Sequence, residues 1–190
     1  MTCRWRVYWC DAVEGGSDAM SSAEDDEFRD FVVSRSAALL RVAFLLTGDR
    51  GHAEDLLQTA LMKTSRRWTH LVDRDASYAY VRRAMVNTQT SWLRRRRVVE
   101  SFVDVVPESV EHLDDFSAIE GRMLPALAQL PPGMRAIIVL RFYEDLGEAE
   151  AARVLGCSVG TVKSQTSRGL ARLRAYFADQ PSSHALREDL

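Results

Sequence analysis

The chain has 190 residues, of which 46% are hydrophobic and 27% are charged, and its formal net charge is -2. These proportions are typical of a globular protein, and they exclude an intrinsically disordered chain and a fibrous repeat. Because the total charge is close to zero, any affinity for a polyanion has to come from the way charge is distributed along the chain.

A polar leader precedes the first predicted helix. Residues 1–24 combine a basic start with a stretch rich in Gly, Ser, Asp and Glu, and no apolar run follows the basic residues. We therefore expect a disordered leader rather than a secretory signal peptide, with Met20 as an alternative translation start. No run of about 18 apolar residues occurs, which argues against a membrane span. The three cysteines lack disulfide or zinc spacing and fit a reducing cytoplasm.

Two amphipathic helices are predicted next. Between residues 25 and 48, apolar side chains recur close to every 3.6 residues, and Gly48 can end the helix. In the second helix Asp49 can cap the N-terminus. Its buried stripe consists of Ala53, Leu56, Leu57, Ala60, Leu61, Thr64 and Trp68. Its opposite face carries Asp55, Gln58, Thr59, Met62 and Arg66, which taken alone are typical of an ordinary solvated face.

A third helix, from about Tyr78 to Arg97, is predicted in a stretch that contains no acidic residue. Its inward side is marked by Val81, Met85 and Thr88. A polar stripe on another side consists of Arg83, Asn87, Ser91 and Arg94. The helix closes with four consecutive arginines, whereas interaction with the helix dipole needs only one or two cations. This run therefore indicates a polyanionic partner.

An acidic stretch separates this helix from the C-terminal third of the chain. Residues 100–120 are rich in Asp and Glu and contain no Lys or Arg. We predict that residues 98–118 form a flexible acidic linker between two small helical domains, residues 25–97 and 119–178. The polarity of the linker suggests loose coupling, but the sequence does not decide whether the two domains touch in the free protein. A disordered tail, residues 179–190, is expected after them. No strand-like alternation of useful length occurs, so the fold class predicted is all-α.

The C-terminal domain ends in a helix-turn-helix pattern. Residues 148–155 can form the first helix, Gly156 can adopt the left-handed conformation in the turn, and Ser158 can cap the second helix. The side chains expected to pack inward are Val159, Val162, Leu170 and Leu173. Those expected to point outward are Thr161, Lys163, Ser164, Gln165, Ser167 and Arg168. Such side chains contact phosphates and base edges, although an amphipathic hairpin with a solvated cationic face is the alternative.

Three motifs, in their order along the chain, resemble the extracytoplasmic-function (ECF) group of bacterial sigma factors. The segment "AEAARVLGCSVGTVKSQTSRGLARLR" is similar to the region 4 helix-turn-helix that reads the promoter −35 element. The segment "GHAEDLLQTALMKTSRRW" resembles the region 2 helix that docks on core RNA polymerase. The segment "YAYVRRAMVNTQTSWLRRRR" resembles the following helix, which recognises and opens the −10 element. The resemblance covers roughly residues 25–177.

The resemblance implies a promoter-specificity subunit in the cytoplasm, with core RNA polymerase and promoter DNA as partners and an anti-sigma factor as a further candidate. It implies −35 contacts by the outward side chains of the helix-turn-helix. It implies −10 contacts by Arg83, Asn87, Ser91, Arg94 and Arg95. A flipped base would lie at the loop of residues 71–77, and Asp55, Gln58 and Met62 would bind core polymerase. No cofactor, metal, membrane or small-molecule substrate is implied.

Three positions depart from the family pattern. Thr59 stands where the family often has an acid, Gly147 where a Ser or Thr cap is usual, and Gln165 where Arg is frequent. The first bears on the strength of core binding and the last on the promoter sequence that is recognised.

Two other functions compete with this interpretation. A conventional transcription regulator could bind operator DNA through residues 119–177 without polymerase, but this leaves the arginine-rich third helix unexplained. An enzyme is not indicated, because the four histidines are scattered and no nucleotide-binding, zinc-protease or serine-hydrolase motif occurs.

Overall fold

The computed structural model describes residues 22–71, 76–99 and 122–179, and all regular structure in these ranges is helical. The helices before the gap at 100–121 are α2 (Ser22–Thr47), α3 (Arg50–Ser65), η1 (Trp68–His70) and α4 (Ser77–Val99). Those after it are α6 (Met123–Ala128), α7 (Pro132–Ile138), η2 (Val139–Tyr143), α8 (Glu148–Leu155) and α9 (Val159–Ala178). The predicted all-α class is confirmed for the described residues. None of their helices has the length and apolar character needed to cross a membrane.

The ends of the predicted domains agree only partly with these helices. Helix α2 begins at Ser22, inside the predicted leader, and α4 continues to Val99, inside the predicted linker. The rest of the leader, most of the acidic linker and nearly all of the tail lie outside the described residues. The predicted domain boundaries therefore stay a prediction.

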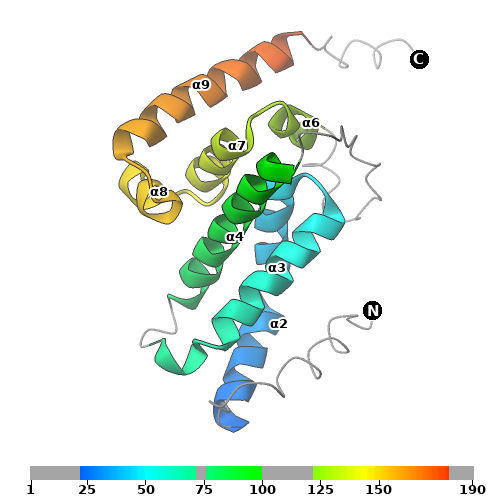
Figure 1. Ribbon diagram of the computed structural model, residues 1–190, viewed down its shortest axis with the longest axis vertical. Coiled ribbons are helices and arrows are strands. Elements are labelled where there is room, and N and C mark those ends of the chain that lie inside the picture. Colours follow the sequence, from blue (N-terminus) through cyan, green and yellow to red (C-terminus); the bar gives the residue numbers. More distant parts are fainter. Residues whose placement is uncertain (1–21, 72–75, 100–121, 180–190) are drawn as a thin grey trace, which may run out of the picture.

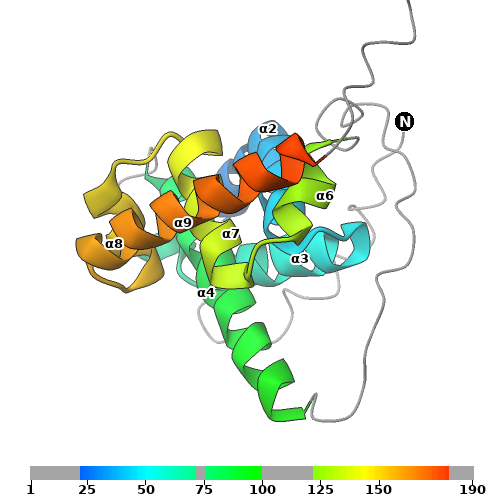
Figure 2. The same cartoon turned by 90° about the horizontal axis from the view of Figure 1, so that it is seen from above.

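Helices α2, α3 and α4 form an N-terminal unit in which each helix contacts the other two (Figure 1). An aromatic cluster closes the end of this unit that contains η1. Trp68 is 1% exposed, and its ring meets Phe28 edge-on at 4.8 Å between ring centres and Phe31 at 5.4 Å. Seen from above, the C-terminal half of α4 extends away from the other described helices (Figure 2).

Helices α6 to α9 form a C-terminal unit in which α9 lies across the shorter helices (Figures 1 and 2). The close approach of α9 to α7 depends on Gly169. A Cβ atom at this position would lie 3.0 Å from the Ile138 side chain and 3.1 Å from that of Met134. Helix η2 continues α7 as a wider, π-helical turn.

Short-range signals account for several helix ends. The Asp49 carboxylate accepts a 2.7 Å hydrogen bond from the His52 amide, and the Ser158 hydroxyl accepts one of 3.1 Å from the Thr161 amide, so both predicted N-caps are confirmed. Pro132 is the first residue of α7. Gly48 and Gly156 end α2 and α8 at φ values of 78° and 64°, a conformation that L-residues rarely adopt.

One packing prediction for α9 is wrong. Val159 was expected to point inward, but 38% of it is exposed because it is the first residue of the helix. The inward stripe starts one turn later, at Val162, and continues through Gly169 and Leu173.

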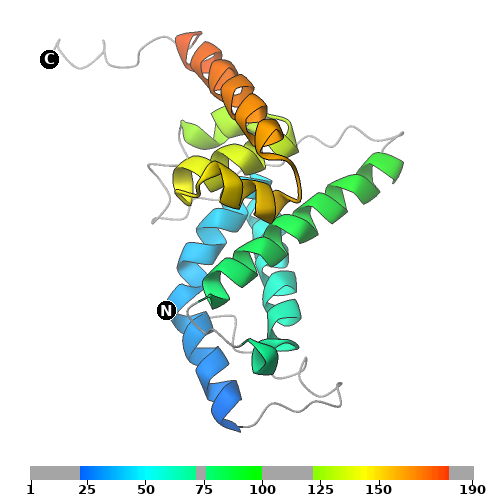
Figure 3. The same cartoon turned by 90° about the vertical axis from the view of Figure 1, so that its left-hand side faces the viewer.

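The two units lie directly against each other. Helix α4 contacts α7 and α8, and α2 contacts α7 and η2 (Figure 3). Buried apolar residues from both units form one continuous core. The expected loose coupling, which rested on the polarity of the linker, is therefore not what the structure shows.

Candidate nucleic-acid interface

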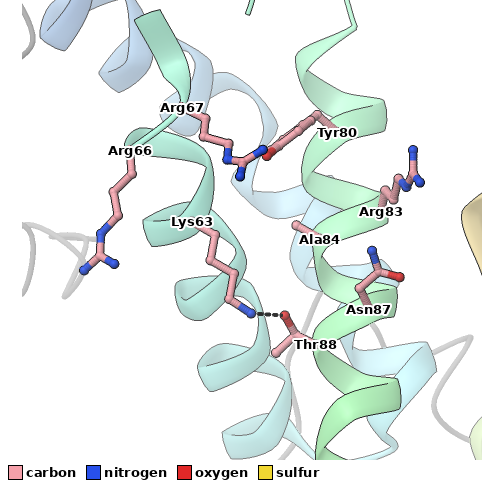
Figure 4. Close-up of a pocket in the computed structure, with 8 residues that line it drawn as sticks. All are labelled: Lys63, Arg66, Arg67, Tyr80, Arg83, Ala84, Asn87 and Thr88. Atoms are coloured by element: carbon pink, nitrogen blue, oxygen red, sulfur yellow. Dashed lines mark hydrogen bonds between the residues drawn. The ribbon is translucent and has the colours of Figure 1, made fainter. Parts of the chain in front are cut away.

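A basic cavity of about 720 Å³ lies between the C-terminal end of α3 and the middle of α4 (Figure 4). None of the described residues that line it is acidic. The lining consists of Lys63, Arg66, Arg67, Tyr80, Arg83, Ala84, Asn87 and Thr88. Four cations, one aromatic ring and one amide around a hollow of this size suit a phosphate chain with its bases.

One cation in this cavity holds the two helices together. The Lys63 ammonium donates a 2.8 Å hydrogen bond to the hydroxyl of buried Thr88, which joins α3 to α4 (Figure 4). The side chains of Arg66, Arg67 and Arg83 are exposed. In Figure 4, Arg67 extends toward the Tyr80 ring, whereas Arg66 points away from α4. Most of the positive charge here is therefore open to solvent.

The structure brings together part of the set predicted for the −10 element. Arg83 and Asn87 lie one turn apart on α4, are exposed and line the cavity. Ser91, a further turn along, is half-buried. Arg94 and Arg95 belong to α4, but their side chains lie outside the described residues, as does most of the loop expected to receive a flipped base.

Sequence reasoning missed the α3 side of this cavity and Tyr80. Lys63, Arg66 and Arg67 lie between the last members of the apolar stripe, and they could have been noticed as a basic cluster just before the polar loop. Tyr80 lies three residues before Arg83, so the two share a helix face. Their meeting across two helices is a tertiary feature that helix periodicity alone does not reveal.

Helices α8 and α9 form the predicted helix-turn-helix. In the outward set, Thr161, Lys163, Ser164, Ser167 and Arg168 are exposed, whereas Gln165 is half-buried. The Lys163 ammonium lies 3.6 Å from the Glu148 carboxylate in a pair that is largely exposed, so it remains available to another anion. Gly147 precedes α8 without any side-chain cap.

The residues predicted to bind core polymerase lie on one face of α3. Asp55 is exposed, and Gln58 and Met62 are half-buried. Asp55 also lines a second cavity of about 470 Å³, which Pro132 and Arg135 of α7 line from the other unit. The C-terminal unit therefore borders this face of α3.

The side of α4 opposite the basic cavity carries a buried polar cluster. The Arg82 guanidinium donates to Glu144 at 3.0 Å and to Glu150 at 3.2 Å, and the Tyr78 hydroxyl donates to Glu144 at 3.0 Å. Burial, together with the negative charge of Glu144, raises the pKa of Tyr78 above its ordinary value. Sequence reasoning missed this cluster, although an arginine beside an apolar stripe is a signal that a partner is needed.

No group of three or more His, Cys, Asp and Glu side chains in the described ranges is arranged to hold a metal ion. Cys157 lies in the turn of the helix-turn-helix, where it is half-buried.

Comparison with known proteins connects both units to one family. Residues 121–173 match the family described as sigma-70, region 4. The RNA polymerase sigma-E factor of Streptomyces avermitilis is 42% identical over 156 residues, which cover 82% of this chain and 87% of the relative. The ECF RNA polymerase sigma factor SigL of Mycobacterium tuberculosis is 32% identical over 163 residues, which cover 81% of this chain and 90% of the relative. Such coverage includes the N-terminal unit as well as the helix-turn-helix.

The chain belongs to the ECF family of RNA polymerase sigma factors. A sigma-factor role, rather than that of an operator-binding regulator, follows from this membership. The fold of this sigma factor also matches solved structures. The sigma factor RpoE of Bartonella quintana, solved in complex with the anti-sigma factor NepR, aligns with a TM-score of 0.63 and 26% identity over 82% of this chain and 99% of that one. CnrH, solved with the cytosolic domain of CnrY, shares the fold at a TM-score of 0.55 and 23% identity. The alignment covers 92% of this chain and 98% of CnrH.

Proposed function

We propose that this sigma factor binds core RNA polymerase through α3, holds the opened −10 element at the basic cavity of α4, and reads the −35 element with α9. The observation that carries the proposal is the presence of two exposed, cation-rich surfaces on two separate helical units of one chain. In this proposal the polymerase, working in the cytoplasm, makes the phosphodiester bonds, and the sigma factor supplies no catalytic group or cofactor. The units correspond to the proposed region 2 and region 4 domains.

At the −10 element the cavity provides complementary chemistry for single-stranded DNA. Arg66, Arg67 and Arg83 neutralise phosphates, and the Tyr80 ring offers a surface on which a base can stack. The Asn87 amide can both donate to and accept from a base edge. Taking a base out of the duplex costs a few kcal/mol, which stacking and hydrogen bonding in the cavity would offset.

At the −35 element α9 would act as the recognition helix. Its first turns carry exposed Lys163 and Arg168 for phosphates or guanine, and exposed Thr161, Ser164 and Ser167 for shorter contacts. Gln165, which is half-buried, can reach a base only from the edge of this surface. We assign it the smallest part in promoter discrimination.

Core binding is assigned to the α3 face of Asp55, Gln58 and Met62. Its mixture of one acid, one amide and one thioether is suited to a protein surface rather than to DNA. An anti-sigma factor is a further proposed partner, because RpoE and CnrH were both solved bound to partner proteins, NepR and the cytosolic domain of CnrY.

Run-off transcription with purified core polymerase on a pool of promoter fragments tests the proposal. Discrete transcripts that appear only when the protein is added are the expected result, and their start sites would define both elements. Gel shifts run with and without core polymerase complete the test. Tight, specific duplex binding by the protein alone, without new transcripts, would contradict the proposal in favour of an operator-binding regulator.

A further inference from the structure

One of the four cations that line the basic cavity differs from the others in the way it is held. The Lys63 side chain crosses from α3 to α4, and its ammonium donates a 2.8 Å hydrogen bond to the Thr88 hydroxyl (Figure 4). The other three cations, Arg66, Arg67 and Arg83, are not fixed in this way by any side chain of the described residues. Lys63 therefore has a defined position in the cavity, whereas the arginines can move.

The acceptor of this hydrogen bond belongs to the core. Thr88 is 2% exposed, and a buried hydroxyl needs a hydrogen-bond partner. Because threonine is branched at Cβ and Thr88 lies in the middle of a helix, the rotation of its side chain is restricted. The hydroxyl thus holds the ammonium at one place before any ligand enters the cavity.

The bond to Thr88 leaves the ammonium able to bind an anion. An ammonium has three N–H donors, and Thr88 accepts from one of them. No acidic side chain is present among the described residues that line the cavity, so no carboxylate of the lining competes for the other two. Lys63 as a whole is also exposed. It therefore combines a fixed position with accessible donors.

This position is close to the amide that is proposed to read a base. Thr88 directly follows Asn87 along α4, and both residues line the same cavity. Contacts to phosphates fix the register of a protein on a nucleic acid, whereas contacts to base edges provide the sequence information. A phosphate bound at Lys63 would therefore determine which base lies within reach of Asn87.

We propose that Lys63 is the phosphate anchor of the −10 site and that Thr88 is the positioning residue that holds it in place. The inference rests on the proposed function, since it adds two residues to those assigned to the same cavity. The ligand is one phosphate of the opened strand, next to the base that Asn87 reads. The three arginines add positive charge along the strand, but Lys63 sets its register.

Preorganisation gives Thr88 a measurable effect. Thr88→Val keeps the shape of the side chain and removes the hydroxyl, so the ammonium is no longer held before the strand binds. This change should weaken binding by about 2- to 12-fold, equivalent to the 0.5–1.5 kcal/mol needed to immobilise a long side chain. The charge of Lys63 is unchanged, so the slope of log affinity against log salt should stay as in the wild type.

Lys63→Met removes the phosphate contact itself. Methionine keeps an unbranched side chain without the charge, so the affinity should fall at least as far as in Thr88→Val. The salt slope should decrease by about 0.7 unit, the value for one phosphate of a single strand. Adding Thr88→Val to Lys63→Met should cause no further loss, because Thr88 acts through Lys63. Thr88→Ser keeps a hydroxyl and should restore most of the affinity.

Two control variants separate these effects from general damage. Thr90→Val also removes a hydroxyl from α4, but this hydroxyl donates at 2.8 Å to the Val86 carbonyl oxygen and does not line the cavity. Arg50→Met removes one positive charge from α3, at a residue that pairs with Glu54 about 20 Å of helix before Lys63. Neither control should change the affinity for the strand or the salt slope.

The experiment uses holoenzyme assembled from core polymerase and the full-length protein. The probe is a strand that the wild-type holoenzyme selects from a pool of short random single strands, and its binding is followed by fluorescence anisotropy at several salt concentrations. Circular dichroism melting confirms that each variant is folded.

A series of neutral probes then locates the phosphate. Each probe carries a methylphosphonate in place of one phosphate of the selected strand. In the wild type, one of these replacements should weaken binding as much as Lys63→Met does, and it should have no further effect in Lys63→Met. The replaced phosphate should flank the base at which Asn87→Ala loses discrimination.

Two results would overturn the anchor. The first is a Lys63→Met holoenzyme that keeps the wild-type salt slope and the wild-type response to every methylphosphonate, which would leave Lys63 as a structural link between α3 and α4. The second is a loss for Thr88→Val that persists in the Lys63→Met background or that Thr88→Ser does not restore. Failure of the proposed function has a different signature, because the wild-type holoenzyme would then select no strand beyond those that core polymerase selects alone, and the anchor would fail with it.

Discussion

Asn87 and Arg83 lie one turn apart in the basic cavity, yet they are expected to contribute differently to the −10 site. Asn87→Ala should remove discrimination at one base, costing about 1–3 kcal/mol for the preferred sequence with little effect on others. Arg83→Ala should instead weaken opening on every sequence and reduce the slope of log affinity against log salt by about one unit. Transcription from promoters randomised at the −10 element, repeated at several salt concentrations, measures both effects.

The assignments of these two residues can fail separately. A uniform loss for Asn87→Ala across all promoters would contradict its role in base discrimination. An unchanged salt slope for Arg83→Ala would remove it from the set of phosphate contacts.

On α9, Lys163→Ala or Arg168→Ala should weaken transcription from promoters that depend on the −35 element and leave core binding intact. Both side chains are exposed in the first turns of the helix, where a recognition helix meets the major groove. Arg174→Ala is a suitable control, since Arg174 is also exposed on α9 but lies more than a turn beyond the predicted contacts. Unchanged transcription from both variants would contradict the assignment of α9 as the recognition helix.

The residues of the candidate sites were predicted unevenly from sequence, for a physical reason. Arg83 and Asn87 on α4, and Lys163 on α9, were accessible to sequence reasoning because each lies on an outward helix face in a stretch free of acidic residues. Tyr80, Lys63 and Arg82 were not, because their importance comes from what another helix places opposite them. A pattern within one helix determines which side chains share a face, but it does not identify the neighbour of that face.

Among the helices, the packing of α9 on α7 depends most sharply on a single position. Gly169→Val should lower the stability of the C-terminal unit by about 1–3 kcal/mol, because its side chain would overlap Ile138 and Met134. Gly160→Ala on the same helix should be neutral or stabilising by up to about 1 kcal/mol, since a Cβ there meets only the Ser158 hydroxyl at 3.8 Å. Thermal unfolding followed by circular dichroism compares the two, and equal melting temperatures would contradict the close approach.

Helix ends were predicted better than helix packing. The sequence alone identifies residues that end helices through contacts within a few positions of the chain. Asp49 and Ser158 cap helix N-termini, and Gly48 and Gly156 end helices with a positive φ. Val159 was predicted to be buried and is exposed, because the 3.6-residue repeat shows which face of a helix is apolar but not at which residue the packing against another helix begins. The π-helical turn η2 was not foreseen, since no local residue type specifies it.

For the molecule as a whole, the shared core predicts cooperative unfolding. Apolar residues of both units form one cluster, and the bonds of Arg82 and Arg135 cross between them. Scanning calorimetry of the free protein should therefore show a single transition whose calorimetric and van't Hoff enthalpies agree. Two separate transitions in the wild-type protein would indicate units that are independent in solution.

The all-α class was predictable from periodicity and turn residues, but the way the helices before and after the acidic segment pack together was not. The polar linker suggested independence, yet the decisive attraction comes from Arg82 and Glu144, which are 62 residues apart. Local composition contains no information on pairs that lie so far apart in the chain. The charge that matters for assembly is therefore a matched pair rather than the acidity of the connecting segment.

The π-helical turn η2 makes this assembly sensitive to the length of the chain. Its wider turn is marked by the Glu144 amide, which donates at 3.1 Å to the carbonyl oxygen of Val139, five residues earlier. A π-turn holds one residue more than an α-turn, and each residue of an α-helix advances the chain by about 100°. Deleting one residue here would rotate Glu144 and α8 away from Arg82 while leaving every reading side chain intact. The insertion or loss of one residue in this turn would thus change how the C-terminal helices pack against α4.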